Sequence, residues 1–348
     1  MRATSSKRPA RILHVGLNTG GDPVGLSRGE RALGFESDVM VFDPHPFGYE
    51  HDIEIGLNGS TWLGGWLKLL RAVAREAMRY DVIHFEYGYT VVQRLRHGRL
   101  YTEMPLLKRM GKTIIAQFHG DDARPPEANP WGFQEPEYLE YMRLMQPPRR
   151  ALMLANADRT FYVNPDLHEW LPGASFRPYA SVDPQEVKPV PPPGGEEVTV
   201  AHAPSHRGIK GTEHVEGAIA ELRAEGLPVR LQLVEGVSRE QALREFVRAD
   251  LAVDQLHLGW YGGFALEVMA LGRPVICHID DEDNPFGSEL PIVRATPETL
   301  RDALRGLVVD RERRLALGRA SRGFVEEHHD PRQVARTVLE GLVPIPGS

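Results

Sequence analysis

Two cationic side chains stand at a strand-to-helix junction in the second half of the chain. The apolar run Val198–His202 is followed by Ala203–Thr212 (APSHRGIKGT), in which Arg207 and Lys210 each precede a glycine. Glycines let a ligand approach backbone amides closely, and the N-terminus of a helix favours anions. The pattern predicts a diphosphate cradle neutralised by Arg207 and Lys210. The alternative is that both are solvated loop residues.

A glycine pair opens another helix farther along the chain. The segment Gly262–Glu267 reads GGFALE, and the helix that it begins ends at Gly272. The amides of Gly262 and Gly263 can meet phosphate or sugar oxygens, and the Glu267 carboxylate can accept hydrogen bonds from a diol such as ribose. A glutamate near the start of a helix also interacts favourably with the helix dipole, so Glu267 alone has a second explanation.

Alternating strands and helices must position these residues. In the first half, apolar runs of strand length lie at Arg11–Leu17, Asp38–Phe42, Asp81–Phe85, Thr113–Phe118 and Asp158–Val163. Helical patterns separate them, and the same alternation restarts at Val198. A strand, a glycine turn, a helix and a strand in that order open a doubly wound parallel sheet. We therefore expect an α/β protein with two Rossmann-like domains.

A proline-rich segment separates the two halves. Residues 183–197 (DPQEVKPVPPPGGEE) contain five prolines and two glycines, a composition typical of interdomain linkers. The predicted partition is a first domain at 1–182, a linker at 183–197 and a second domain at 198–330. Residues 331–348 are expected to form a helical tail that could cross back to the first domain.

The composition of this 348-residue chain narrows the classes of function. A formal net charge of −7 argues against a general nucleic-acid binder, which needs a basic surface. The single cysteine, Cys277, excludes an intramolecular disulfide and a multi-cysteine zinc site. Neither an apolar leader nor an apolar run of membrane-spanning length stands out. These features predict a cytoplasmic protein.

Taken together, the two glycine-containing patterns resemble those of a known enzyme family. A strand followed by R-G-x-K-G, and later an A-D-L strand and G-F-x-x-E-x-M-A-x-G-x-P-V, is similar to the donor domain of retaining glycosyltransferase family 4. The resemblance is strong over residues 198–280. It is weaker over the first half, whose order of elements is similar to the family's acceptor domain. It implies the GT-B fold, in which two Rossmann-like domains face each other across a cleft.

The resemblance also implies roles for individual residues. Arg207 and Lys210 would grip the diphosphate of a nucleotide-sugar donor, and Glu267 would hold its ribose. The donor-binding positions that it implies are Gly20, Gly21, Gly262, Gly263, Phe264 and Glu267. The two glycines of the first strand-to-helix turn match the family's glycine-rich loop, although a tight turn with positive φ explains them equally.

His119 is the candidate catalytic residue of the first half. It directly follows the expected strand Thr113–Phe118, so it lies at a strand end that faces the predicted crevice. It matches the family's histidine near the donor sugar. An imidazole there can hydrogen-bond a sugar hydroxyl or stabilise developing charge.

The chain departs from the family at one position. The first glutamate of the family's paired-glutamate motif, which contacts the transferred sugar, would fall near Gly259, where it is absent. The adjacent Trp260 and Tyr261 are also unusual. The departure keeps two alternatives open. One is a non-catalytic protein that binds a nucleotide sugar, and the other is a sugar-nucleotide epimerase or hydrolase of the same fold.

The resemblance implies a retaining hexosyltransferase that acts in glycoconjugate or polysaccharide biosynthesis. The donor would be a UDP- or GDP-sugar, and the acceptor a hydroxyl of a sugar, a lipid-linked molecule or a small molecule. Arg207 and Lys210 would stabilise the charge of the leaving diphosphate, which takes the acceptor proton. No cofactor or metal is implied, and the acidic run Asp281–Asp283 is interpreted as a solvated turn.

A predicted helix at Trp62–Tyr80 is amphipathic. Its apolar face carries Trp62, Trp66, Leu69 and Val73 at helical spacing. A neighbouring stripe is basic and consists of Lys68, Arg71, Arg75 and Arg79. Such a helix either packs its apolar face on a core or lies on an anionic membrane. The second interpretation would suit a lipid-linked acceptor and a protein that is peripheral at the inner face of the membrane. The sequence leaves both open.

Overall fold

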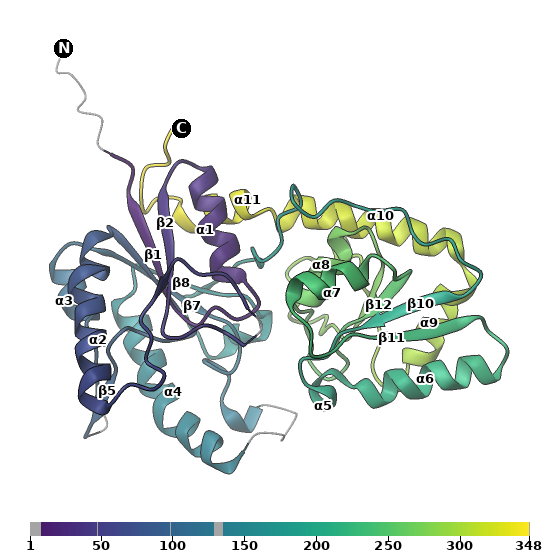
Figure 1. The fold of residues 1–348 in the computed structure, drawn as a ribbon, viewed down its shortest axis with the longest axis horizontal. Helices are drawn as coiled ribbons and strands as arrows, with labels where there is room; N and C mark the ends of the chain where they lie inside the picture. Colours follow the sequence, from purple (N-terminus) through teal and green to yellow (C-terminus); the bar gives the residue numbers. More distant parts are fainter. Residues whose placement is uncertain (1–7, 47, 98, 129–134, 348) are drawn as a thin grey trace.

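The computed structural model describes residues 8–46, 48–97, 99–128 and 135–347. Within these ranges the chain forms two separate parallel sheets, and the two units that contain them lie side by side (Figure 1). The α/β class expected from the alternation of strands and helices is confirmed.

The first sheet has the strand order β3-β2-β1-β4-β7-β8-β9, and every neighbouring pair is parallel. Its strands are β1 (Arg11–Gly16), β2 (Glu36–Val41), β3 (Ile53–Glu54), β4 (Val82–Glu86), β7 (Thr113–Phe118), β8 (Arg159–Tyr162) and β9 (Ser175–Phe176). A small antiparallel hairpin joins β5 (Arg94–Arg96) and β6 (Arg99–Tyr101). The five strands predicted for this half correspond to β1, β2, β4, β7 and β8.

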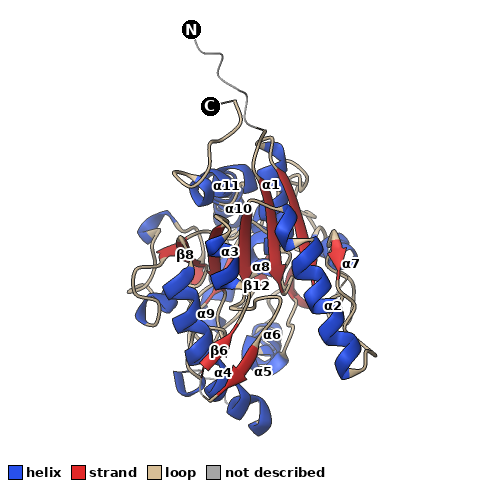
Figure 2. Cartoon of the chain, turned by 90° about the vertical axis from the view of Figure 1, so that its left-hand side faces the viewer, coloured by secondary structure: helices blue, strands red, loops and turns tan. Residues whose placement is uncertain are grey.

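Helices cover both faces of the first sheet (Figure 2). One face carries α1 (Asp22–Ala32) and α11 (Pro331–Leu339), and the other carries α2 (Trp62–Arg75), α3 (Met104–Arg109) and α4 (Pro136–Asn156). Successive strand residues point to opposite faces, so Ile12 of β1 packs under α1 and α11 while Leu13 packs under the other three helices. Burial on both faces explains why the strands are continuous apolar runs.

Helix α4 was not predicted. It contains the adjacent residues Pro147 and Pro148 in its interior, where proline removes a hydrogen-bond donor and normally ends a helix. Its buried face still packs Met145 and Met153 inward, so tertiary packing holds the helix together across the prolines. A periodicity argument that treats proline as a stop cannot recover such an element.

The predicted apolar face of α2 needs a correction. Leu69 and Val73 pack partly buried against the core of the first sheet, so they are not available to an outside surface. The apolar side chains that α2 does expose are Trp62, Leu63, Leu67 and Leu70. Among the described helices, none is both long and apolar enough to cross a bilayer.

The second sheet has the order β11-β10-β12-β13-β14 and is also parallel. Its strands are β10 (Val198–His202), β11 (Val229–Leu233), β12 (Leu251–Val253), β13 (Val275–Cys277) and β14 (Val293–Arg294). Its helices are α5 (Arg207–Lys210), α6 (Thr212–Ala224), α7 (Arg239–Phe246), α8 (Gly263–Ala270), α9 (Leu300–Val309) and α10 (Arg311–His328). Helices α7, α8 and α10 cover one face, and α6 and α9 cover the other.

The chain passes between the two units twice. Residues 177–197 contain no helix or strand and lead from the first sheet to the second. After α10 the chain returns, and α11 packs against α1 of the first unit (Figure 1). This contact depends on Gly29, because a Cβ there would lie 2.1 Å from the backbone oxygen of Pro331. Arg332 of α11 also pairs at 2.8 Å with Asp183, a residue of the connecting segment.

Candidate active site

The carboxyl ends of the two sheets meet at a cavity of about 280 Å³ that both units line. The first unit contributes Thr19 and Gly20 from the turn after β1, together with Tyr49. The second unit contributes the loops after β10 and β11 and the start of α8. Five of the predicted site residues line this cavity, namely Gly20, Lys210, Gly263, Phe264 and Glu267. We call it the donor cavity.

Lys210 is held at the wall of the donor cavity by a buried carboxylate. Its Nζ donates to Oδ1 of Asp254 at 2.9 Å and also to the side chain of Gln255. The other oxygen of Asp254 accepts the backbone N–H of Gly262 at 2.7 Å, so one carboxylate joins the lysine to the cap of α8. Asp254 is fully buried and Lys210 nearly so. A buried counter-ion orients the ammonium for an anionic ligand.

Arg207 does not join Lys210 in the donor cavity. Its guanidinium forms a two-pronged pair with Glu235, with Nε and Nη2 at 2.9 and 2.7 Å from the carboxylate oxygens. The side chain is about half exposed. The sequence correctly places Arg207 and Lys210 on the same turn. Only the fold shows that Glu235, at the end of β11, engages one of them.

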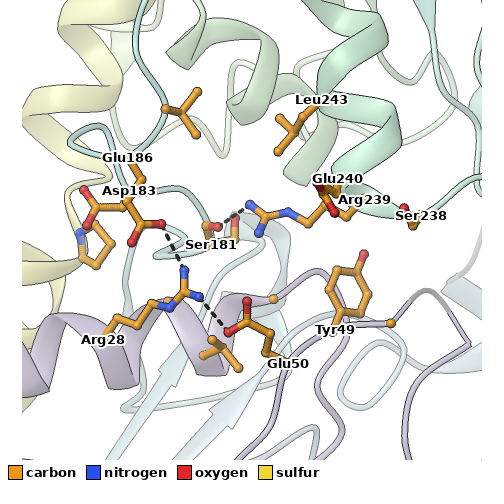
Figure 3. Close-up of a pocket in the computed structure, with 16 residues that line it drawn as sticks. Arg28, Tyr49, Glu50, Ser181, Asp183, Glu186, Ser238, Arg239, Glu240 and Leu243 are labelled. Atoms are coloured by element: carbon orange, nitrogen blue, oxygen red, sulfur yellow. Dashed lines mark hydrogen bonds and ion pairs between the residues drawn. The ribbon is translucent and has the colours of Figure 1, made fainter.

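Glu267 faces a partner that the sequence does not reveal. Nε of Arg239 lies 2.5 Å from Oε1 of Glu267. The same guanidinium donates to the backbone oxygen of Ser181 at 3.0 Å, and Figure 3 shows this second bond. Burial raises the pKa of Glu267, and the cation of Arg239 opposes that shift. Arg239 begins α7 after a capping box formed by Ser238 and Gln241, so the sequence predicts the start of this helix at Arg239 but not the ion pair.

A second cavity, of about 520 Å³, adjoins the donor cavity near the connecting segment (Figure 3). Tyr49 and Arg239 line both cavities. In the second cavity, Arg28 of α1 bridges Glu50 and Glu186 at 2.7 and 3.1 Å. Gly21, the N-cap of α1 with a φ of 74°, also lines this cavity, so the adjacent predicted glycines 20 and 21 face different spaces.

His119 lies at the end of β7, as predicted, but lines a neighbouring cavity of about 400 Å³. Its Nε2 is 2.8 Å from Oε2 of Glu86, which ends the adjacent strand β4. Its ring stacks on Tyr87 with 3.7 Å between centroids, and its backbone N–H donates to Asp122. The imidazole therefore has a fixed orientation, with a buried carboxylate behind it.

Glu86 belongs to a buried network of ionisable groups. His14 of β1 lies 3.0 Å from Glu86 through Nδ1 and 3.0 Å from Glu30 through Nε2. Burial by itself lowers the pKa of His14, but the two carboxylates outweigh burial and raise the pKa to about 9. Burial likewise opposes ionisation of Glu86, yet His84, His119 and His14 hold its pKa well below the usual range.

Among the described residues, two groups of side chains each bring three metal-ligating atoms within 4.8 Å of one another. They are His14 with Glu30 and His84, and Asp22 with Glu86 and His119. Hydrogen bonds within the protein already engage both nitrogens of His14 and Nε2 of His119. His14, Glu30, Glu86 and His119 therefore already serve as partners to one another. Asp22 pairs with Arg177, and neither ring nitrogen of His84 makes a hydrogen bond to a described residue.

The position where a glutamate was expected is closely packed. A Cβ added to Gly259 would lie 2.9 Å from Cβ of Asp280, whose backbone N–H donates to the Gly259 oxygen at 2.8 Å. A larger residue at 259 would therefore displace Asp280. Trp260 and Tyr261 are almost fully buried in the core of the second unit. The unusual aromatic pair is thus part of the packing.

A fourth cavity, of about 470 Å³, lies beside this segment and is lined by both units. Gly262 contributes to it, as do Asp280 and Asp283, and Asp166 faces them from the first unit. Asp283, the last residue of the acidic run, lies 3.5 Å from His168 of the first unit. The acidic run therefore contacts the other unit at its end, while Asp281 pairs with Arg294 at the surface.

Comparison with solved structures relates the whole chain to known proteins. Sucrose-phosphate synthase from Thermosynechococcus elongatus matches with a TM-score of 0.64 at 18% identity, over 94% of this chain and 97% of that one. HepE of Anabaena, in complex with UDP-glucose, matches with 0.61 at 12% identity, over 95% and 98%. WaaG, a glycosyltransferase involved in lipopolysaccharide biosynthesis, matches with 0.59 at 13% identity, over 95% and 100%.

The chain has the GT-B fold. The alignments span both units, which confirms the predicted architecture of two Rossmann-like domains. A putative UDP-N-acetylglucosamine 2-epimerase from Listeria monocytogenes shares the fold with a TM-score of 0.54 at 14% identity, over 96% and 95% of the two chains. No protein-family model matches, and no curated protein is significantly similar in sequence. The GT-B fold therefore rests on tertiary structure.

Proposed function

We propose that this GT-B protein is a retaining glycosyltransferase that moves a sugar from a UDP-sugar to an acceptor hydroxyl. The observation that supports the proposal best is the donor cavity, where Lys210, Glu267 and the amide end of α8 surround one space. An ammonium and helix amides suit a diphosphate, and a buried carboxylate suits a ribose diol. UDP and UDP-glucose occupy solved structures of the similar HepE, which favours uridine as the base.

The proposed transfer replaces one bond at the anomeric carbon by another on the same face. The bond from that carbon to the diphosphate oxygen breaks, and a bond to the acceptor oxygen forms. The acceptor proton passes to the leaving diphosphate. Lys210 and the amide of Gly263 stabilise the charge that develops on the leaving group, which is the role that a divalent metal would otherwise fill, while the Gly262 amide is engaged by Asp254. Arg207 would assist only after leaving Glu235.

His119 is proposed to contact the sugar from the acceptor side. Glu86 accepts a hydrogen bond from Nε2 of His119, and the stacked ring of Tyr87 fixes the plane of the imidazole. The opposite nitrogen is then the atom that can bond a sugar hydroxyl. Glu86 acts through His119, so it is a positioning residue.

The domain assignment is part of the proposal. We assign residues 1–182 to the acceptor domain, 198–330 to the donor domain and 183–197 to the hinge. Residues 331–348 are the tail, which packs on the acceptor domain. Two segments of the chain cross between the domains, so closure of the domains over the donor would bend both segments. Closure excludes water from the leaving group and strengthens the electrostatic contacts there.

We further propose that helix α2 rests on an anionic membrane that carries the acceptor. Trp62 is 79% exposed, and Leu63, Leu67 and Leu70 are also exposed. Lys68 and Arg71 lie on the same helix, which contains no acidic residue. Apolar side chains beside cations match the interface of an anionic bilayer.

The donor site is tested by calorimetric titration with UDP, GDP, ADP and TDP. We expect UDP to bind, and the variant Glu267→Ala to lose the binding. For Lys210 the test uses Lys210→Met together with Asp254→Asn, because the double change leaves no unpaired buried charge. A double variant that folds and still binds UDP as tightly as the native protein would refute the donor assignment.

A second candidate function is the binding of a nucleotide sugar without transfer, favoured by the missing carboxylate at Gly259. Incubation with UDP-glucose, followed by proton NMR of the sugar, separates the candidates. Transfer or slow hydrolysis with retained α-configuration supports the enzyme. An unchanged sugar, despite tight binding and a range of acceptors, supports the binding protein. A change of configuration at another carbon supports an epimerase.

A further inference from the structure

The cavity beside His119 has an unusual lining. Its wall carries the tyrosines 87, 89, 138 and 179, together with Arg149 of α4. Ile209 and Leu258 close it from the donor domain. At about 400 Å³ it has the size of a small-ligand site. We call it the tyrosine cavity.

Arg149 is a buried cation without a carboxylate partner. It is 5% exposed, yet no carboxylate of the described residues lies within ion-pair distance. Nε donates to Gln93 at 2.9 Å, and Nη2 donates to the hydroxyl of Tyr141 at 2.6 Å. The guanidinium also bonds the Tyr89 hydroxyl, so the hydrogen-bond partners that the described residues give it are all neutral side chains. The guanidinium carbon lies 4.4 Å from the ring centroid of Tyr89, so aromatic faces compensate part of the charge.

Other buried arginines of this chain have different partners for their charge. Arg177 is fully buried and pairs with Asp22. Arg124, in the wall of the same cavity, is equally enclosed and pairs with Asp166 at 2.6 Å. Arg273 has no carboxylate either, but its guanidinium donates to several backbone carbonyls. Among these four described arginines, Arg149 alone lines a cavity with neither a carboxylate nor a backbone carbonyl as its acceptor. Because a buried cation without compensation is costly, a missing partner is expected to come from outside.

The acidic residues of the cavity do not supply that partner. Asp122 accepts the backbone N–H groups of His119 and Gly120, at 3.0 and 2.7 Å. Asp121 lies 3.5 Å from Arg124. Both carboxylates are thus engaged elsewhere, so within the described lining of this cavity Arg149 is the cation that lacks a carboxylate partner.

We propose that the tyrosine cavity is the acceptor site and that it takes an acceptor carrying a phosphate or a carboxylate. The anionic group would pair with Arg149, and the hydroxyl-bearing ring would stack on a tyrosine face beside His119. The inference rests on the proposed function, since it names the substrate class of the second substrate. The same anionic group could belong to a soluble sugar or to a lipid headgroup.

The test compares hexose 6-phosphate, hexuronate and neutral hexose by calorimetry on the UDP-loaded protein at constant ionic strength. We expect an anionic sugar to bind at least about tenfold more tightly than the neutral hexose, because a charge-assisted hydrogen bond is involved. Arg149→Met should remove that difference. Its melting temperature should stay the same or rise, because a buried unpaired cation has been replaced by an apolar side chain of similar length.

The matched control is Arg143→Gln on the same helix, an exposed arginine that pairs with Glu127. It should keep the preference for anionic sugars. In a second arm, vesicles containing phosphatidic acid replace the soluble sugars. A difference between native protein and Arg149→Met that appears only with vesicles assigns the anion to a lipid, and one that appears only with sugars assigns it to a soluble acceptor.

Three results would overturn the inference. They are equal binding of neutral and anionic sugars, an undiminished preference in Arg149→Met, and an equal loss in the Arg143→Gln control. A large fall in the melting temperature of Arg149→Met would show that Arg149 serves the packing of α4. UDP binding is measured on every sample, so a failed donor site is recognised separately from a failed acceptor site.

Discussion

Arg239 of α7 and Glu267 of α8 form an ion pair in the wall of the donor cavity, with 2.5 Å between Nε and Oε1. The carboxylate proposed to hold the donor ribose therefore already has a cationic partner. One carboxylate oxygen remains for the ligand, and the cation opposes the rise that burial causes in the pKa of Glu267. The pair links nucleotide affinity to the charge of Arg239.

Replacing Arg239 by alanine should make UDP binding sensitive to acid. Burial raises the pKa of Glu267, and without the opposing cation that pKa rises further. A protonated carboxyl accepts hydrogen bonds poorly, so UDP affinity of the variant should fall by about tenfold per pH unit below the new pKa. Calorimetry from pH 8 to pH 5 measures this. Arg244→Ala, an exposed change on the same helix, is the control, and parallel curves for all three proteins would contradict the prediction.

Lys210→Met should destabilise the donor domain. It leaves the fully buried Asp254 with only the backbone N–H of Gly262, and an uncompensated buried charge costs roughly 3–5 kcal/mol. Adding Asp254→Asn should recover most of that loss. Urea unfolding of the single and double variants measures the coupling. Equal stability of the two would mean that the ion pair is unimportant to the fold.

The buried histidine network should make the acceptor domain less stable in alkali. The folded pKa of His14, about 9, lies above its unfolded value of about 6.5. Its stabilising contribution is therefore complete below pH 6.5 and is lost as the pH rises through 9; it is on the order of 3 kcal/mol. Urea unfolding at pH 6.5, 8 and 9.5 tests this. The variant His14→Gln should show a shallower decline than the native protein, and an identical decline would disprove the assignment.

The contact between α1 and α11 should fail when Gly29 gains a side chain. A Cβ there would lie 2.1 Å from the Pro331 oxygen, so Gly29→Ala must separate the helices and should cost roughly 1–3 kcal/mol. Gly217→Ala is the matched control, because a Cβ at this site on α6 meets nothing within 4 Å. The control should gain roughly 0.5–1 kcal/mol from helix propensity. Urea unfolding distinguishes the opposite signs.

Membrane contact through α2 predicts that the protein sediments with vesicles that contain phosphatidylglycerol. Less of the protein should sediment with neutral phosphatidylcholine vesicles. Binding should weaken as salt rises, because the cations of α2 are screened. Trp62→Ser combined with Leu67→Ser should reduce it. Val309→Ser, an exposed apolar change in the donor domain, should leave it unchanged. Equal sedimentation of all variants would exclude α2 as the contact.

Local patterns in the sequence were sufficient for the longer strands of both sheets and for part of the donor cavity, but not for the two-residue strands β3, β9 and β14. Lys210 and Glu267 follow strands β10 and β12 along the chain, and parallel strands bring their carboxyl ends to one edge of a sheet. That rule is enough to place both residues in one cavity. It also places His119 at the corresponding edge of the other sheet. It says nothing of α4, where two prolines hide the helix and with it the position of Arg149.

By itself, the sequence determined the two-domain α/β organisation and the strand ends where its candidate residues lie, because hydrophobic periodicity and glycine turns act over a few neighbouring residues. Only the tertiary structure decided which side chain each candidate contacts. Arg207 pairs with Glu235, Glu267 with Arg239 and His119 with Glu86. In each pair the two residues belong to different elements or loops of the fold. Such pairs depend on how the sheets and helices pack at the scale of an ångström, and the sequence spacing of the partners does not contain that information.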